Sequence, residues 1–277
     1  MTGTLAGRTI VMSGGSRGIG LAIALRAAAD GANVVLLAKT DVADPRLEGT
    51  VHTAAAEIEA AGGHALAVVG DVRKDEDVTR AVDAAIERFG GIDIVVNNAS
   101  AIDLRPTSNI DMKKYDLMLD INTRGTFLLS KTCLPHLEKS TNGHILTLSP
   151  PMDLDPQWAG RYLAYTIAKY GMSLVTLGLA KELAGVGIAA NSLWPRTTIA
   201  TAAVRNLLGG DAAMASSRTV DIVSDAAHVI LTRDSRTCTG NFFIDDEVLA
   251  QEGITDLDVY RAAPGDGRLT PDLFLDA

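Results

Sequence analysis

A glycine-rich turn between a buried strand and a helix most constrains the fold of this chain. Residues 9–13 form an apolar run typical of a buried strand, and residues 19–29 are rich in alanine and leucine at helical spacing. The turn between them reads Gly14, Gly15, Ser16, Arg17, Gly18, Ile19 and Gly20. Such a turn lets the backbone approach a pyrophosphate, whose charge then faces the free amide groups of the helix N-terminus. We therefore expect a bound nucleotide here; the alternative is a surface turn that uses glycine for positive φ angles.

Apolar runs alternate with helical stretches along the rest of the chain. Further strands are expected at 33–38, 65–69, 92–96, 144–148, 187–193 and 241–244, and helices at 75–89, 113–137 and 163–183. Alternation of this kind implies parallel strands joined by crossover helices. The sequence therefore predicts an α/β fold, a Rossmann-type doubly wound parallel sheet of about seven strands with helices on both faces.

Length and composition fit a single domain. The chain has 277 residues, of which 47% are hydrophobic, enough for one large core. We expect residues 1–250 to form the dinucleotide-binding domain and residues 251–277 to form a tail packed on it. The tail from Asp245 onward should be mostly irregular, and the polar, proline-broken run at 40–50 should be a loop beside the nucleotide.

Charge and cysteine usage exclude several classes of protein. A net charge of −9 and a pI near 5.0 argue against nucleic-acid or anionic-membrane partners. We expect no secretory signal and no membrane span, because no basic segment precedes a long apolar run and no stretch looks long and apolar enough. Cys133 and Cys238 fit reduced thiols in a cytoplasmic protein, and the five scattered histidines predict no metal site.

Tyr165 and Lys169 are the candidate catalytic pair. Four residues apart on a predicted helix, they lie on one face one turn apart. A cation beside a phenol favours the phenolate, so we expect a lowered tyrosine pKa and acid/base chemistry near neutrality. The alternative is an ordinary helix with a tyrosine and a solvated lysine. Tyr162 is a weaker candidate, because its partner at this spacing, Thr166, carries no charge.

The end of the second predicted strand bears on cofactor choice. An acidic residue there would bind the adenosine ribose hydroxyls, but this chain has Ala38, Lys39 and Thr40. Lys39 suits a 2′-phosphate, and Arg17 could add a forked donor. NADP(H) is therefore favoured over NAD(H), unless Lys39 is a solvated loop residue and Arg17 only caps the turn.

Roughly the first nine-tenths of the chain resembles the short-chain dehydrogenase/reductase superfamily. The resemblance rests on the glycine motif at 13–20, on Asn97-Asn98-Ala99-Ser100 and on Tyr165 with Lys169. It implies hydride transfer at a nicotinamide, with Tyr165 as general acid/base and Lys169 holding the ribose hydroxyls. It further implies that Asn122 bends its helix and supports a water relay to Lys169; the alternative is an interhelical hydrogen bond. The remaining cofactor contacts it implies are Asp71, Val72, Asn98, Ala99 and Pro195; the alternative for Asp71 is a helix or turn cap. Some members carry a sterol-carrier domain, and we expect none in this chain.

The serine that usually polarises the substrate carbonyl in this superfamily is missing. Thirteen residues before Tyr165 stands Met152, and counting from the preceding strand gives Pro150. Neither side chain donates a hydrogen bond. Ser149 could serve if its loop turns inward, or it could cap that loop. We expect either this displaced serine or an oxyanion partner taken from elsewhere. Arg196 after Pro195 and the acidic run at 245–247 also depart from the family pattern.

Two functions are compatible with these residues. The first is an NADP(H)-dependent oxidoreductase that interconverts a hydrophobic alcohol and its ketone or aldehyde. The alternative is a nucleotide-binding sensor or interaction protein with weak or no turnover, because the usual serine is absent. The long helices at 113–137 and 163–183 resemble those that build dimers and tetramers in this superfamily, so we expect a homodimer or homotetramer.

Overall fold

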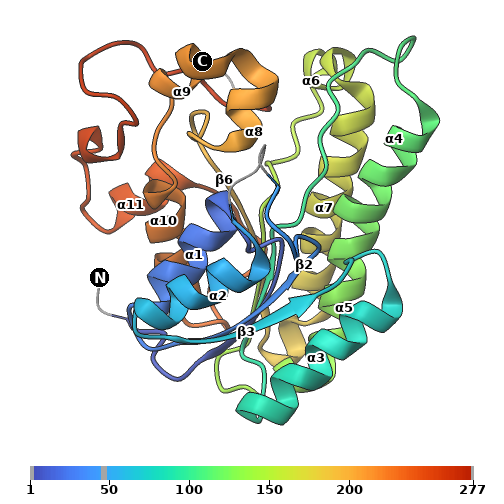
Figure 1. The fold of residues 1–277 in the computed structure, drawn as a ribbon, viewed down its shortest axis with the longest axis vertical. Helices are drawn as coiled ribbons and strands as arrows, with labels where there is room; N and C mark the ends of the chain where they lie inside the picture. The colour runs from blue at the N-terminus through green and yellow to red at the C-terminus, as the bar shows by residue number, and fades with distance from the viewer. Residues whose placement is uncertain (1–2, 45–48, 276–277) are drawn as a thin grey trace.

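Seven parallel strands form the central sheet in the computed structural model, which describes residues 3–44 and 49–275 (Figure 1). Their spatial order is β3-β2-β1-β4-β5-β6-β7. This order reverses direction at β1, as in a doubly wound sheet, so the expected fold class is confirmed. The strands are β1 Thr9–Ser13, β2 Asn33–Ala38, β3 His64–Val69, β4 Ile94–Asn97, β5 His144–Thr147, β6 Ala189–Trp194 and β7 Phe242–Ile244.

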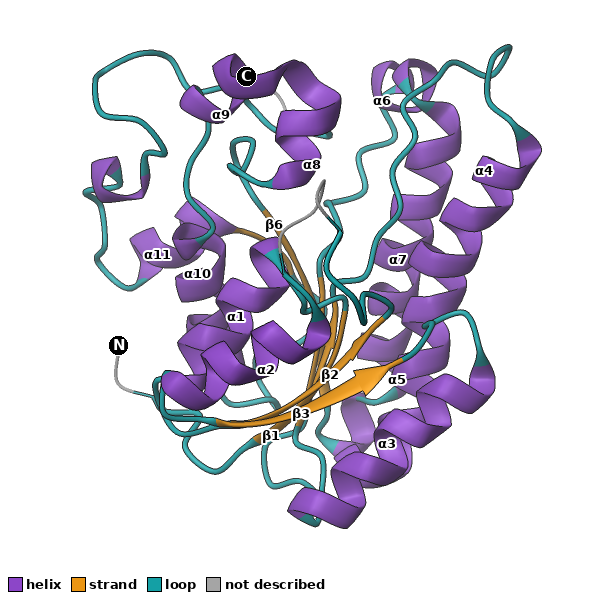
Figure 2. Ribbon diagram, viewed as in Figure 1, coloured by secondary structure: helices purple, strands orange, loops and turns teal. Residues whose placement is uncertain are grey.

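Helices cover both faces of the sheet (Figure 2). One face carries α1 Gly18–Ala28, α2 Val51–Ala60 and α10 Asp221–Thr232. The other carries α3 Asp75–Phe89, α5 Gly125–Leu137 and α7 Leu163–Glu182. The central strands are buried on both faces and therefore consist of continuous apolar runs rather than alternating ones. Helices α2 and α10 were not predicted from the sequence.

Shorter elements lie between these helices. They are α4 Met112–Met118, α6 Pro156–Arg161, α8 Ala202–Val204, α9 Gly210–Ala215 and α11 Asp245–Gln251, with single 3₁₀ turns at Ala184–Val186 and Asp258–Tyr260 and a π-helical turn at Arg205–Gly209. The tail thus begins with a helix, where we expected mostly irregular structure. Its first turn holds Asp245, Asp246 and Glu247, and acidic residues stabilise a helix N-terminus. In the expected loop at 40–50, residues 45–48 lie outside the described residues.

The helix expected at 113–137 is interrupted in its middle. Between α4 and α5 the backbone forms a π-helical segment, Leu119–Arg124. Asn122 lies in this segment with no exposed surface. Its side-chain oxygen accepts a hydrogen bond from the amide of Ala101 at 2.7 Å, and its amide donates to the carbonyl of Ala101 at 3.0 Å. π-Segments often accompany functional sites, and this one attaches the segment after β4 to the long helix.

Helix α7 is long and apolar enough to cross a membrane by length and composition, contrary to our expectation from the sequence. More than half of its apolar window is buried inside the fold, against β5, β6 and α5. It also carries the buried Lys169. We therefore assign α7 to the core of the domain.

Candidate active site

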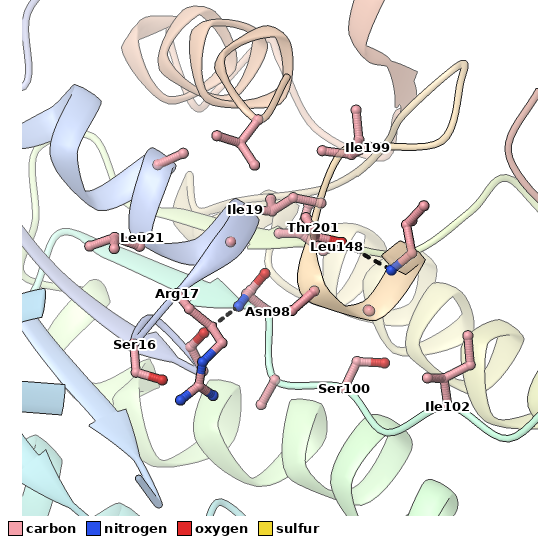
Figure 3. Close-up of a pocket in the computed structure, with 18 of the residues that line it drawn as sticks. Ser16, Arg17, Ile19, Leu21, Asn98, Ser100, Ile102, Leu148, Ile199 and Thr201 are labelled. Atoms are coloured by element: carbon pink, nitrogen blue, oxygen red, sulfur yellow. Dashed lines mark hydrogen bonds between the residues drawn. The ribbon is translucent and has the colours of Figure 1, made fainter. Parts of the chain in front are cut away.

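One large cavity joins the glycine turn to the Tyr165 and Lys169 pair. Its volume is about 1450 Å³, more than a single small ligand requires. Ser16, Arg17 and Ile19 line it from the glycine turn, and Figure 3 shows Ser16 and Arg17 at its lower left. Asn98, Ser100 and Ile102 line it from the segment after β4, and Ile199 and Thr201 line it from the segment after β6. The cavity lies at the carboxyl ends of the strands, where the order reverses and where ligands bind in open α/β sheets.

Close packing explains the glycines of the turn. Gly14 has a φ of 75° and Gly18 one of 58°, values that favour glycine. A Cβ at Gly20 would lie 2.4 Å from the side-chain nitrogen of Asn98, which donates to the carbonyl oxygen of Gly14 at 2.7 Å. A Cβ at Gly15 would lie 2.5 Å from a methyl group of Leu36. Gly15 and Gly20 therefore seat the helix, whereas the cavity is lined by Gly14, Ser16, Arg17, Gly18 and Ile19.

The far end of the cavity carries a group of charged side chains. Lys39 Nζ lies 3.2 Å from Oδ2 of Asp71, and Arg73 also binds this carboxylate. Hydrogen bonds from Arg73 hold the pKa of Asp71 well below its usual range, so this carboxylate stays ionised at neutral pH. Arg17 donates to the carbonyl of Gly49 at 2.7 Å. Lys39, Asp71 and Val72, all expected near the adenosine, line the cavity together.

Tyr165 and Lys169 lie at the opposite end and are almost fully buried, with exposed fractions of 5% and 2%. Both line the cavity. Lys169 Nζ donates to the carbonyl of Leu148 at 2.5 Å and lies 4.8 Å from the centre of the Trp194 ring. These contacts fix the ammonium between the end of β5 and β6, in the wall of the cavity that Tyr165 also lines.

The expected depression of the Tyr165 pKa is wrong for this structure. Burial, assisted by the negative charge of Asp272, raises the pKa of Tyr165, and a hydrogen bond with Ser100 only partly opposes this. Burial also lowers the pKa of Lys169 to about 7. Desolvation is the largest cause of both shifts, because burial disfavours the charged form of each group. The phenol carries its proton at neutral pH.

Asn122 does not line the cavity, and its side chain is committed to the backbone of Ala101. It interrupts its helix, as the resemblance implied, and holds the segment that carries Ser100. Asn122 therefore supports the cavity wall indirectly, through its two hydrogen bonds to the backbone of Ala101.

Ser149 does not come to the cavity. It has no exposed surface, and its hydroxyl lies 2.8 Å from that of Ser192, which in turn donates to Thr176 at 3.1 Å. This hydroxyl chain runs from β5 towards α7, inside the protein. Ser149, which we considered as a displaced catalytic serine, is therefore an internal packing residue. Met152 and Pro150 also do not line the cavity.

Three residues at the catalytic end were missed from the sequence. Ser100 lines the cavity beside Tyr165, and it could have been found because it ends the Asn-Asn-Ala-Ser motif. Asp272 and Leu273 line it from the C-terminal tail, which we expected to be mostly irregular and to which we assigned no site residue. Among residues 3–44 and 49–275, no group of three or more His, Cys, Asp or Glu could hold a metal ion.

The residues present fit a dinucleotide. Gly14 and Gly18 line the cavity at the start of α1, and the nearest atom to a Cβ built on Gly18 is a methyl carbon of Thr201 at 3.6 Å. The backbone of the turn is therefore open to close approach of a pyrophosphate at the helix N-terminus. Asn98, Ala99 and Pro195 continue the lining from there towards Tyr165. A ribose placed at this end would meet Lys169, the hydrogen-bond donor suited to its hydroxyls.

Comparisons with known proteins agree with this geometry. A family model described as short chain dehydrogenase matches residues 8–209. Hydroxysteroid dehydrogenase-like protein 2 of Xenopus laevis is 57% identical over 275 residues, and that of Homo sapiens is 54% identical. Each alignment covers 99% of this chain and 65% of the relative, so the chain spans about two thirds of the length of these relatives.

Solved structures are similar as well. A short chain dehydrogenase from Mycobacterium thermoresistibile is 54% identical, with a TM-score of 0.94 over 99% of this chain and 97% of that one. Carveol dehydrogenase from Mycobacterium avium, solved in complex with NAD, shares the fold at a TM-score of 0.75 and 24% identity, over 88% of this chain and 97% of that one. The chain therefore belongs to the short-chain dehydrogenase family.

Proposed function

We propose that this chain is an NADP(H)-dependent oxidoreductase that interconverts a hydrophobic alcohol and its ketone or aldehyde. The observation that carries the proposal is the single cavity that joins the glycine turn to Tyr165 and Lys169. At the end that holds Tyr165 and Lys169, the apolar side chains of Ile102, Leu148 and Leu273 line the cavity together with Ser100 and Asp272. Such a lining favours a greasy substrate and excludes water from the reacting atoms.

Tyr165 supplies the proton in this scheme. Its phenol is protonated at neutral pH and stands ready to protonate an alkoxide that develops on a substrate in the cavity. Lys169, with a pKa lowered to about 7, stabilises the phenolate left behind whenever its ammonium is protonated. When bound, a nicotinamide supplies or accepts the hydride. In oxidation the phenolate takes the proton back from the alcohol.

The preference for NADP(H) is supported by the cations at the far end of the cavity. The Lys39 side chain is 59% exposed and ends at Asp71. Because Arg73 also neutralises Asp71, Lys39 can turn to a 2′-phosphate without leaving that carboxylate unpaired. The competing expectation is that the chain uses NAD(H), because carveol dehydrogenase, which has the same fold, was solved in complex with NAD.

Two variants test this function. Tyr165→Phe should lower turnover of hydrophobic ketones by about 10²–10⁴-fold while NADPH binding persists, since it removes only the proton donor. Tyr162→Phe is the matched control. In fluorescence titrations, Lys39→Ala should reduce the preference for NADPH over NADH, with the exposed Lys139→Ala as control. Unchanged turnover in Tyr165→Phe would contradict the proposal.

The alternative function is a nucleotide-binding sensor or interaction protein with little turnover. It is favoured by one observation, the internal position of the Ser149 hydroxyl. Tight binding of NADPH by wild type, without turnover across aliphatic, aromatic and steroid ketones, would select this alternative.

We further propose that the chain forms a homodimer or homotetramer in the cytoplasm through α5 and α7. Large apolar side chains remain exposed on these two helices: Phe127, Leu163, Ile167, Leu174 and Leu177. An exposed row of this kind marks a protein interface. Light scattering of Leu174→Glu tests it, and an oligomer as stable as wild type would contradict this face.

A further inference from the structure

The C-terminal tail reaches the catalytic end of the cavity and is fixed there by its backbone. The amide of Asp272 donates to the carbonyl of Arg196 at 3.0 Å, and the amide of Thr198 donates to the carbonyl of Thr270 at 2.9 Å. The indole of Trp194 donates to the carbonyl of Leu273 at 2.9 Å. The tail thus forms an added edge along the segment after β6, and it holds the side chain of Asp272 in the cavity wall.

An aromatic anchor locks this arrangement. Phe274 is 2% exposed, and its ring lies between 5.4 and 6.1 Å from those of Trp158, Tyr165, Tyr170 and Trp194. The anchor packs on the catalytic tyrosine itself. The aromatic cluster around Phe274 therefore positions both Tyr165 and Asp272, which lies two residues before Phe274.

The carboxyl group of Asp272 has one oxygen available. Oδ1 accepts a hydrogen bond from the amide of Leu273 at 2.6 Å. Oδ2 has no hydrogen-bond partner in the part of the chain that the structure describes, yet the residue lines the cavity and retains partial exposure. A polar atom left without a partner in a largely apolar site is suited to a ligand.

Charged groups around Asp272 come from several elements. Lys169 and Tyr165 face it from α7, and Asp245 faces it from the start of α11. Arg196, adjacent in space, is instead bound to Asp246 and Glu247. Burial raises the pKa of Asp272 to about 7. The negative charge of Asp245 adds to this rise, and the positive charge of Lys169 opposes it. Both forms of the carboxyl are therefore populated near neutrality.

We propose that Asp272 in its protonated form donates a hydrogen bond to the substrate oxygen, in the role that the missing serine would fill. The inference rests on the proposed oxidoreductase function. A neutral carboxylic acid in an apolar site is a strong donor towards developing negative charge, whereas an aspartate could only repel it. Asp272 is the tail's titratable group in the cavity lining, and its free oxygen is the atom that would carry the proton.

The proton balance leaves Asp272 unchanged over a turnover. In the direction of reduction, the carbonyl carbon receives a hydride from the reduced nicotinamide cofactor, which is thereby oxidised. The electron pair of the carbonyl π bond passes to the oxygen, and that oxygen takes its proton from Tyr165. Asp272 contributes a hydrogen bond while the negative charge develops and keeps its own proton.

The test compares Asp272→Asn, Asp272→Leu and Ser100→Ala in ketone reduction with NADPH, starting from 2-decanone and using the best ketone found in a screen. Asp266→Asn, an exposed tail carboxyl, is the control. Removal of one oxyanion donor predicts that Asp272→Leu loses about 10²–10³-fold in kcat. Asparagine keeps a donor, so Asp272→Asn should stay within about tenfold of wild type. Circular dichroism checks that each variant folds.

The pH profile separates this role from a merely structural one. Because the acid form is the donor, wild-type turnover should fall as pH rises through the pKa of Asp272. Lys169 titrates in the same range, so the comparison with Asp272→Asn is decisive: that variant should lose the part of the decline that Asp272 causes. Independently of any substrate, infrared spectra of the NADP⁺ complex should show a protonated-carboxyl band that titrates near neutrality and disappears in Asp272→Asn.

Several results would overturn the inference. These are full activity in Asp272→Leu, a hundredfold loss in Asp272→Asn, an unaltered pH profile in Asp272→Asn, or no titrating carboxyl band. Loss in Ser100→Ala with none in Asp272→Leu would instead assign the donor role to Ser100. Failure of the proposed function is distinct, because it would leave Tyr165→Phe as active as wild type.

Discussion

Truncation of Phe274 should detach the C-terminal tail from the catalytic end. Phe274→Ala removes a ring that is 2% exposed and packs on four other aromatic rings. Each aromatic pair contributes about 0.5–1.5 kcal/mol, and truncation of a buried phenylalanine to alanine costs about 3–5 kcal/mol in total. Because the tail is terminal, we expect this loss to appear first as local opening of residues 268–275. The free energy of global unfolding should then decrease by no more than the free energy with which the tail docks on the domain.

The backbone at this position sharpens the prediction. Phe274 has a φ of 70°, the single positive value among the non-glycine residues described. A side chain in this region costs about 1–2 kcal/mol, a cost that alanine retains and glycine relieves. The greater unfolded-state entropy of glycine offsets about 0.5–1 kcal/mol of that gain. Phe274→Gly should therefore be as stable as Phe274→Ala or more stable, by up to about 1.5 kcal/mol, in contrast to the usual order.

Hydrogen exchange of the tail and urea unfolding followed by circular dichroism measure both effects. Val259→Ala, which truncates a tail side chain that is 72% exposed, is the matched control. Protection of residues 268–275 in Phe274→Ala equal to that of wild type, with an unfolding free energy changed by less than about 1 kcal/mol, would refute the packing argument. A Phe274→Gly variant clearly less stable than Phe274→Ala would refute the strain argument.

Three further predictions concern the cavity wall and the core. Gly20→Ala should lose NADPH affinity at least about tenfold, because its Cβ would lie 2.4 Å from the Asn98 nitrogen, whereas Gly91→Ala has open space; equal titrations would contradict this. Asn122→Ala should cost about 1–3 kcal/mol for each Ala101 backbone group left unpaired, measured by urea unfolding, and a neutral result would show that water replaces the side chain. Burial lowers the pKa of His144 from 6.5 to about 4, so the unfolded state binds more protons between these values. The contribution of His144 to the free energy of unfolding is then fully present above about pH 6.5 and decreases by up to about 3 kcal/mol as the pH falls towards 4. In urea unfolding, His144→Gln should show a weaker dependence of this free energy on pH than wild type.

The fold and the cofactor end of the cavity were predictable from the sequence because their signals are local. Apolar runs of strand length, the glycine turn and the spacing of Tyr165 and Lys169 each lie within a few consecutive residues. Secondary structure and one-turn spacing then determine which side chains share a face. The seven strands and the common cavity follow from these patterns.

Side-chain direction and charge state were decided only by tertiary structure. Ser149 lies two residues after the end of β5, but its hydroxyl turns to Ser192 on β6, a partner 43 residues away. The pKa of Tyr165 rises because distant segments bury it, whereas the spacing to Lys169 along the sequence had led us to expect a lowered pKa.

The tail illustrates the same limit. In the sequence, Asp272 is an aspartate in a segment rich in glycine and proline, about a hundred residues beyond Tyr165. Local pattern alone determined the strand, turn and helix that bind a nucleotide. Only the packing of Phe274 on α7 and the pairing of the tail with the segment after β6 bring a carboxyl into the cavity that the Tyr165 phenol lines. The physical reason is that contacts between remote residues depend on the whole fold, whereas periodicity and turn chemistry depend on adjacent residues.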